Sequence, residues 1–261
     1  MKIIAICNQK GGVGKTAIAI NLAAALSQQS ETAILVDFDP QGHGTEGVGQ
    51  KDLYTSDGAN LYDGLMQPKT KVDDLVHELP HETFYLIPAH IKMMLAEQAL
   101  NPVRGREYRL SNLLASLSDV FDWCVIDCPP NLGILTDNAI YAARNLVIPV
   151  QAEQTSMRAL DLLLDQVESI EDGLRIKVDI LAVVPNLVQD SGLAKRILGD
   201  LRTNIAVTTP FEFRKRVVLQ EAYEAGRSIF THEGDRAKVP AINELRDLYL
   251  QLAGLVRERS R

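Results

Sequence analysis

Apolar residues in this chain form short unbroken runs that alternate with longer stretches in which they recur every three or four positions. The runs are rich in β-branched residues and lie at residues 3–7, 33–38, 84–87, 123–127, 146–150 and 180–184. Runs that are apolar throughout are typical of strands buried on both faces of a sheet. Helical spacing is clearest at residues 16–28, 156–170 and 193–203. This alternation predicts a parallel sheet with helices on both faces.

Residues 42–80 break the alternation, because they are polar, contain several glycines and show little periodicity. We expect them to form an insertion of loops and short helices over the edge of the sheet. No internal repeat or linker divides the chain, and its hydrophobic residues, 46% of the total, suffice for a sizeable core. The sequence therefore predicts a single α/β domain over residues 1–261, with a mostly parallel twisted sheet.

A glycine-rich segment lies between the first predicted strand and the first predicted helix. Residues 8–16 read Asn-Gln-Lys-Gly-Gly-Val-Gly-Lys-Thr. Glycines at these positions let backbone N–H groups turn inward around phosphates, and the following helix adds the positive end of its dipole. We expect Lys15 to reach the β- and γ-phosphates of a nucleotide and the Thr16 hydroxyl to bind Mg²⁺. The predicted fold is therefore that of a P-loop NTPase, with nucleotide contacts from Lys10, Gly11, Gly12, Val13, Gly14, Lys15, Thr16 and Ala17.

An additional lysine, Lys10, stands at the start of the loop, where an ordinary P-loop has no special requirement. With it, residues 10–16 resemble the deviant Walker A motif of the ParA/MinD family of ATPases. The resemblance implies ATP and Mg²⁺ as cofactors and a homodimer in the ATP state. It also implies that Lys10 crosses the dimer interface to the partner's nucleotide and stabilises transition-state charge there, as an arginine finger does.

Two strands that end in aspartates resemble further motifs of the same family. Residues 34–42 resemble its switch I and residues 121–130 its Walker B strand and switch II. The resemblance implies that Asp39 positions the attacking water, as a catalytic residue beside Lys10 and Lys15. It places Asp37 and Asp127 near Mg²⁺, and a buried aspartate with neither metal nor partner would be costly.

A late segment at residues 213–229 also resembles one in this family, so the match to the family covers about residues 1–250. The wording of both switch segments is typical of its ParA (Soj-like) partitioning branch. It implies an ATPase that is weak alone, binds DNA non-specifically as an ATP dimer, and positions a plasmid or chromosome. A ParB-like or analogous adaptor would stimulate hydrolysis, and the protein would be cytoplasmic and nucleoid-associated.

Lysines and arginines in the second half of the chain are the candidates for DNA phosphate contacts. They are Lys195, Arg196, Arg202, Arg214, Lys215, Arg216 and Arg227. The formal net charge of −7 argues against a general nucleic-acid coat, so these residues are either a local basic face or ordinary solvated charges. Pro185 and Asn186 follow a predicted strand, where relatives contact adenine; they could equally form an ordinary turn.

Three other functions use the same ATPase core. The first is the positioning of a protein cargo, such as a compartment or chemosensory cluster, which carries no readable motif. The second is a MinD-like membrane-associated ATPase. We expect no membrane contact, because the last helical pattern, residues 242–255, is typical of a helix packed on its own domain. The third is a small-molecule ligase or kinase, whose relatives usually lack the lysine at position 10.

Overall fold

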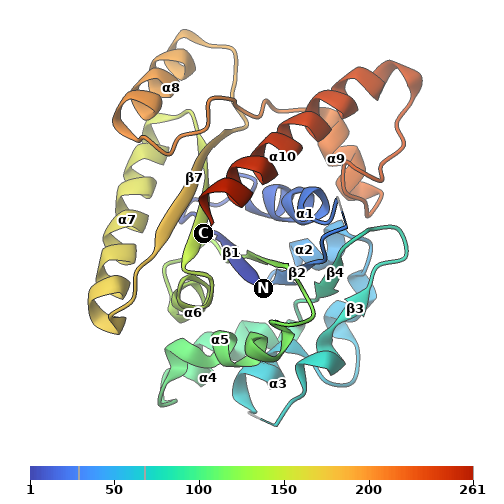
Figure 1. Cartoon of the computed structure of the whole chain (residues 1–261), viewed down its shortest axis with the longest axis vertical. Coiled ribbons are helices and arrows are strands. Elements are labelled where there is room, and N and C mark those ends of the chain that lie inside the picture. Colours follow the sequence, from blue (N-terminus) through green and yellow to red (C-terminus); the bar gives the residue numbers. More distant parts are fainter. Residues whose placement is uncertain (29, 68, 261) are drawn as a thin grey trace.

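The computed structural model describes residues 1–28, 30–67 and 69–260 and contains one seven-stranded sheet (Figure 1). The strand order is β3-β4-β2-β5-β1-β6-β7, and every pair is parallel except β3 with β4. The predicted α/β class and mostly parallel sheet are confirmed, and all six predicted runs form strands. The strands are β1 Lys2–Ile6, β2 Ala33–Asp37, β3 His77–Glu78, β4 Tyr85–Ile87, β5 Trp123–Asp127, β6 Asn145–Gln151 and β7 Asp179–Asn186.

Six helices of eight or more residues accompany the strands in the described part of the chain. They are α1 Lys15–Leu26, α6 Ile134–Ala143, α7 Gln154–Leu174, α8 Gly192–Asn204, α9 Val217–Glu224 and α10 Val239–Arg259. The shorter α-helices are α2 His43–Gly47, α3 Leu61–Met66, α4 Ala96–Leu100 and α5 Arg109–Leu114. The 3₁₀ helices are η1 Lys51–Thr55, η2 Val72–Leu75, η3 Ile91–Leu95, η4 Arg106–Tyr108, η5 Ala115–Leu117 and η6 Arg236–Lys238.

The sheet buries apolar side chains on both faces, as its unbroken apolar strands require. In β1, Ile4 and Ile6 point into the layer that contains α1 and α10. Ala5 and the following Cys7 point into the opposite layer, which contains α5, α6 and α7. Successive side chains of a strand face opposite ways, so one apolar run serves two cores. The two helical layers are visible on either side of the sheet in Figure 1.

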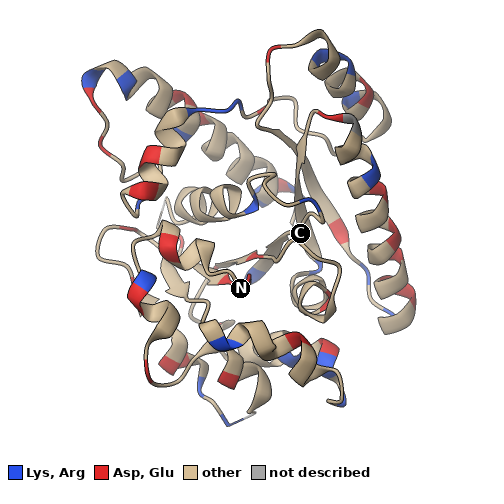
Figure 2. Ribbon diagram, turned by 180° about the vertical axis from the view of Figure 1, so that it is seen from behind, with Lys and Arg blue, Asp and Glu red and all other residues tan. Residues whose placement is uncertain are grey.

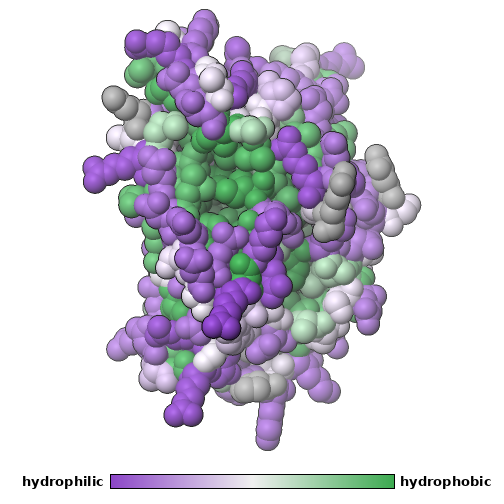
Figure 3. All heavy atoms as spheres, turned by 60° about the vertical axis from the view of Figure 1, so that its left-hand side comes forward, coloured by the Kyte–Doolittle hydropathy of each residue, from purple (hydrophilic) through white to green (hydrophobic). Residues whose placement is uncertain are grey.

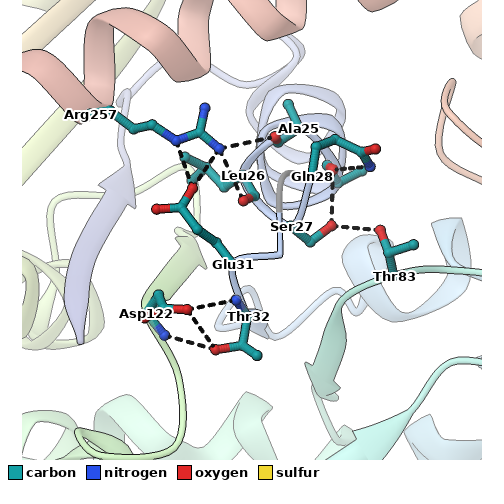
Figure 4. Close-up of polar contacts among 10 residues, drawn as sticks. Ala25, Leu26, Ser27, Gln28, Glu31, Thr32, Thr83, Asp122 and Arg257 are labelled. Atoms are coloured by element: carbon teal, nitrogen blue, oxygen red, sulfur yellow. Dashed lines mark hydrogen bonds and ion pairs between the residues drawn. The ribbon is translucent and has the colours of Figure 1, made fainter.

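The last helix, α10, is held against α1 by apolar packing and by one arginine. Arg257 donates to the carbonyl of Leu26 (3.1 Å) and to the Glu31 carboxylate (2.7 Å), as Figure 4 shows. Arginine supplies several donors in one plane, so it can satisfy carbonyls at the end of α1 and a carboxylate at once. The predicted packing of this helix on its own domain agrees with these contacts.

The face formed by α7 and α8 carries an apolar hollow ringed by polar side chains (Figure 3). These helices also expose large apolar side chains at Leu162 (41%) and Leu193 (49%). Such side chains, when they occur singly, are normal on protein surfaces. Among residues 1–28, 30–67 and 69–260, no helix combines the length and apolar character that crossing a membrane requires.

Candidate nucleotide-binding site

The glycine loop and both aspartate motifs meet at the carboxyl edge of the sheet. Strands β2, β5 and β1 are neighbours, and Asp127 is in register with both Asp37 and Ile6. Ligands of open parallel sheets bind at this edge. A cavity of about 690 Å³ opens there, a size suited to a nucleotide. It is lined by Gly11, Gly12, Gly14, Lys15, Thr16, Ala17, Asp39, Gln41, His43, Glu46, Pro130 and Tyr223.

The glycine loop has a backbone that other residues would adopt only with strain. Gly12 and Gly14 have φ angles of 72° and 87°, in the left-handed region. Two asparagine side chains hold the backbone of the loop through hydrogen bonds. The Asn186 side chain donates to the Val13 carbonyl (2.7 Å), and Asn8 accepts a hydrogen bond from the Lys10 backbone N–H (2.8 Å). Backbone N–H groups in such a turn, followed by a helix N-terminus, form a cradle for phosphate.

Lys15 lies almost buried at the start of α1, with 7% of its surface exposed. Its ammonium group donates to the Lys10 carbonyl (3.3 Å), which bends the side chain back over the loop. Burial lowers the pKa of Lys15, and the nearby carboxylates of Asp127 and Asp39 oppose that shift. Bound phosphates would favour the charged ammonium further, so this residue is suited to an anionic ligand.

Asp37 and Asp127 are both fully buried at the ends of their strands. Asp37 accepts hydrogen bonds through Oδ2 from the Thr45 N–H and hydroxyl, both at 2.6 Å. Its Oδ1 and both carboxylate oxygens of Asp127 have no hydrogen-bond partner among the described residues. Burial raises the pKa of Asp37 to about 7 and raises the pKa of Asp127 well above its usual value.

The three unpartnered carboxylate oxygens, together with the Thr16 hydroxyl that lies near Asp127, are the hard oxygen donors that Mg²⁺ prefers. A divalent cation would also remove the cost of burying both carboxylates. The residues present therefore fit Mg²⁺, with Thr16, Asp37 and Asp127 as the candidates to hold it directly or through water.

Asp39 lies at the inner side of the cavity and is 6% exposed. Its Oδ1 accepts a hydrogen bond from the Gln41 backbone N–H (3.0 Å), which fixes the carboxylate at the start of the predicted switch I. Asp39 lines the cavity, which has room for a water molecule beside this carboxylate. This placement is compatible with the predicted positioning of an attacking water.

Lys10 contacts its own chain rather than the cavity. Its Nζ lies 2.5 Å from a Glu153 carboxylate oxygen and 2.7 Å from the Gln151 side-chain oxygen. The hydroxyls of Thr155 and Ser156 are 3.4 Å and 3.3 Å away. The lysine is thus anchored at the end of β6 and the start of α7, and no motif predicted these contacts.

The remaining predicted residues are the two candidates for adenine contact and the seven candidates for DNA contact. Pro185 and Asn186 are buried at the end of β7, and Asn186 supports the glycine loop. Of the seven basic candidates for DNA contact, four are engaged in ion pairs. Lys195 pairs with Asp190, Arg202 and Arg214 with Glu212, and Arg216 with Glu244. Figure 2 shows ribbon positions of acidic residues (red) interspersed with those of basic residues (blue) on the face it presents.

Several residues at the site escape prediction from the sequence. Thr45, Glu46, Asn8, Gln151 and Tyr223 contact the predicted residues or line the cavity. Asn8 is adjacent to the glycine loop, so its position was a usable signal. Tyr223 comes from α9, more than 170 residues away from Glu46 along the chain, and no local pattern links them.

Comparisons with known proteins agree with this geometry. A family profile described as an AAA domain matches residues 1–180. The sporulation initiation inhibitor protein Soj of Bacillus subtilis is 36% identical over 214 residues, covering 82% of this chain and 79% of Soj.

Solved structures share the fold. Cobyrinic acid a,c-diamide synthase from Mycobacterium smegmatis, with a bound ATP analogue and magnesium, is 30% identical. It aligns with a TM-score of 0.75 over 86% of this chain and 92% of that one. McdA of Cyanothece in complex with ATP is 24% identical and aligns with a TM-score of 0.84, over 98% and 96% of the two chains. The profile match and the identity to Soj together show that this chain belongs to the ParA/MinD family of P-loop ATPases, in its ParA (Soj-like) branch.

Proposed function

We propose that this protein is a Mg²⁺-dependent ATPase that dimerises with ATP and binds DNA non-specifically to position a plasmid or chromosome. Lys15 and the glycine loop hold the triphosphate, and Asp39 positions the attacking water. Thr16, Asp37 and Asp127 hold Mg²⁺, which, when bound, neutralises charge on the β- and γ-phosphates.

The contacts of Lys10 are the observation that carries this proposal. In the single chain its ammonium group is held by Glu153 and Gln151 and does not line the nucleotide cavity. A cavity without its second lysine lacks one source of transition-state charge stabilisation. A second copy that supplies Lys10 across an interface would complete the site, so hydrolysis depends on dimerisation. Such a site suits a slow timer stimulated by a ParB-like or analogous adaptor better than a fast catalyst.

Two observations support DNA binding. The chain belongs to the partitioning branch of the family, and basic residues lie on α8, in the loop before α9 and at position 227. Arg196, Lys215 and Arg227 are the members of the predicted set for which no ion pair is found among the described residues. In a dimer these charges would be duplicated on one surface, and phosphate contacts would make the affinity steeply dependent on salt. This function places the protein in the cytoplasm, on the nucleoid.

The first test is binding of arbitrary DNA by the purified protein without nucleotide, with ADP, with ATP and with a slowly hydrolysed ATP analogue, at several salt concentrations. We expect salt-sensitive binding in the ATP states only. If an ATP-dependent dimer forms but binds no DNA in any state, the nucleoid is not its matrix. A protein cargo or a membrane would then have to serve, with liposome sedimentation as the measurement.

Two variants separate the steps of the cycle. Lys15→Ala removes the phosphate contact, so ATP-dependent dimerisation should be lost. Asp39→Ala should still bind ATP and should accumulate as a dimer on DNA, because hydrolysis lacks its water-positioning carboxylate. ATP turnover and sedimentation velocity check both. Normal turnover by Asp39→Ala would contradict the role given to this residue.

A further inference from the structure

Two segments that are far apart in the sequence touch through their backbones beside the nucleotide cavity. One is residues 46–49 at the end of α2, and the other is residues 223–226 at the end of α9. A Cβ atom on Gly226 would lie 2.6 Å from the Gly49 Cα and 2.8 Å from its nitrogen. Both glycines have left-handed φ angles, 65° and 76°. No side chain lies between the two backbones, so neither segment can move toward the other.

Tyr223 fixes the same contact from the side of the cavity. A Cβ atom on Gly47 would lie 2.6 Å from the Tyr223 ring. The Tyr223 hydroxyl lies 3.3 Å from a Glu46 carboxylate oxygen and donates a hydrogen bond to it. Both side chains line the cavity that contains Asp39 and Lys15. We call the four residues Gly47, Gly49, Tyr223 and Gly226 the glycine–tyrosine junction.

The predicted switch I leads directly into this junction. The Thr45 hydroxyl and N–H bind Asp37, and Asp39 begins the turn that leads to α2. A ligand that moves Asp37 or Asp39 must therefore also move α2 and residues 46–49. At the Gly49–Gly226 contact the two backbones are packed directly against each other, and close-packed contacts of this kind transmit a displacement.

On its other side the junction is connected to basic residues. Arg216 precedes α9, and the Arg227 backbone N–H donates to the Ala222 carbonyl (2.9 Å). The next residues are anchored elsewhere, since Glu82 accepts from Ser228 (2.7 Å) and Asn21 from the Ile229 N–H (2.7 Å). Residues 228 and 229 are therefore held, and a displacement at the junction is passed to α9 and Arg227. There it acts against the ion pair between Arg216 and Glu244 of α10 (2.7 Å).

We propose that the glycine–tyrosine junction couples the nucleotide site to α9, so that ATP binding repositions Arg216 and Arg227. The inference rests on the proposed function, because it assigns the route by which nucleotide binding changes the basic surface. Tyr223 acts here as a positioning residue, through Glu46 and Gly47.

The test is Gly226→Ala, compared with Gly105→Ala. Both glycines have a φ of 65°, so both substitutions carry the same backbone strain. The new Cβ at position 105 meets only the Tyr108 side chain, at 3.3 Å. Hydrogen exchange of residues 214–227 is measured by mass spectrometry with and without a slowly hydrolysed ATP analogue. Analogue affinity is measured on the same samples.

In the wild type and in Gly105→Ala we expect the analogue to change exchange in residues 214–227 at least twofold. Gly226→Ala should bind the analogue within about fivefold of the wild type but lose that change. Tyr223→Phe, which keeps the ring and loses the hydroxyl, should partly reduce the analogue-induced change in exchange. This variant tests the coupling if Gly226→Ala does not fold.

An unaltered exchange response in Gly226→Ala, or the absence of any response in nucleotide-bound wild type, overturns the coupling. Wild type that binds no nucleotide overturns both the coupling and the proposed function. If the exchange responses are as expected but the wild type binds no DNA in any nucleotide state, the coupling through the junction is supported. Only the DNA-binding part of the proposed function is then wrong.

Discussion

Both carboxylate oxygens of Asp127 are buried at the end of β5 without a hydrogen-bond partner among the described residues. A buried, unsatisfied polar group costs about 1–3 kcal/mol, and a charged one more. Burial raises the pKa of Asp127, so above the ordinary pKa of aspartate this carboxyl destabilises the folded state. Asp127→Asn removes the ionisable group and should raise the free energy of unfolding of the nucleotide-free protein by about 1 kcal/mol or more. The same change should abolish stabilisation by Mg²⁺ and ATP. Thermal unfolding with and without Mg²⁺ and ATP measures both effects.

The matched control for Asp127→Asn is Asp161→Asn, which makes the same chemical change at an exposed position of α7. It should alter neither the unfolding free energy nor the response to Mg²⁺ and ATP. If Asp127→Asn destabilises the nucleotide-free protein, the carboxylate has a structural role that its hydrogen bonding does not reveal. Asp127 would then contribute to folding as well as to metal binding.

Glu153 holds Lys10 in the single chain, through a pair in which Glu153 is half exposed. Exposed ion pairs contribute between 0 and about 1 kcal/mol, so the restraint is weak. Glu153→Gln should let Lys10 leave its own chain more readily and strengthen ATP-dependent dimerisation by up to about fivefold. Sedimentation velocity at several protein concentrations measures this. Weaker dimerisation would mean that Glu153 acts across the interface instead.

At the scale of elements, Arg257 and apolar side chains together hold α10 on α1. Its guanidinium binds Glu31 and the carbonyl of Leu26, and it is about one quarter exposed. Hydrogen bonds to charged groups contribute about 1.5–3 kcal/mol, so Arg257→Ala should lower the unfolding free energy by about 2 kcal/mol. Urea denaturation measures the change, with Arg158→Ala on exposed α7 as the control. If Arg257→Ala lowers the unfolding free energy no more than Arg158→Ala does, apolar packing alone holds α10 on α1.

The same elements show what local pattern can and cannot predict. The six buried strands were predictable because each is an apolar run, and α1 and α7 because their apolar residues recur at helical spacing. Strand β3 was not, since two residues, His77 and Glu78, have no periodicity, and their pairing with β4 depends on tertiary context. Motifs singled out Lys15, Asp39 and Asp127, which the fold brings to one edge of the sheet, and Lys10, which contacts Gln151 and Glu153 instead. Tyr223 and Glu153 were missed because only the folded chain brings them to the site.

At the scale of the whole molecule, an acidic protein is proposed to bind a polyanion. The formal charge of −7 repels DNA at long range, so binding depends on local positive charge within about one Debye length, roughly 8 Å. Glu212 lies among the candidate residues and pairs with Arg202 at 2.8 Å and with Arg214 at 3.9 Å. DNA phosphates must compete with this carboxylate for both guanidinium groups.

Glu212→Gln should therefore strengthen DNA binding in the ATP state and steepen its salt dependence. Each additional phosphate contact adds about 0.9 to the slope of log affinity against log salt. The control is Glu168→Gln, which changes the net charge by the same amount. Glu168 is exposed on α7, a helix that carries none of the candidate DNA contacts. DNA titrations at four or more salt concentrations compare the two. If both variants gain equally, net charge governs binding and Arg202 and Arg214 are not DNA contacts; a gain confined to Glu212→Gln places the contact at these two arginines.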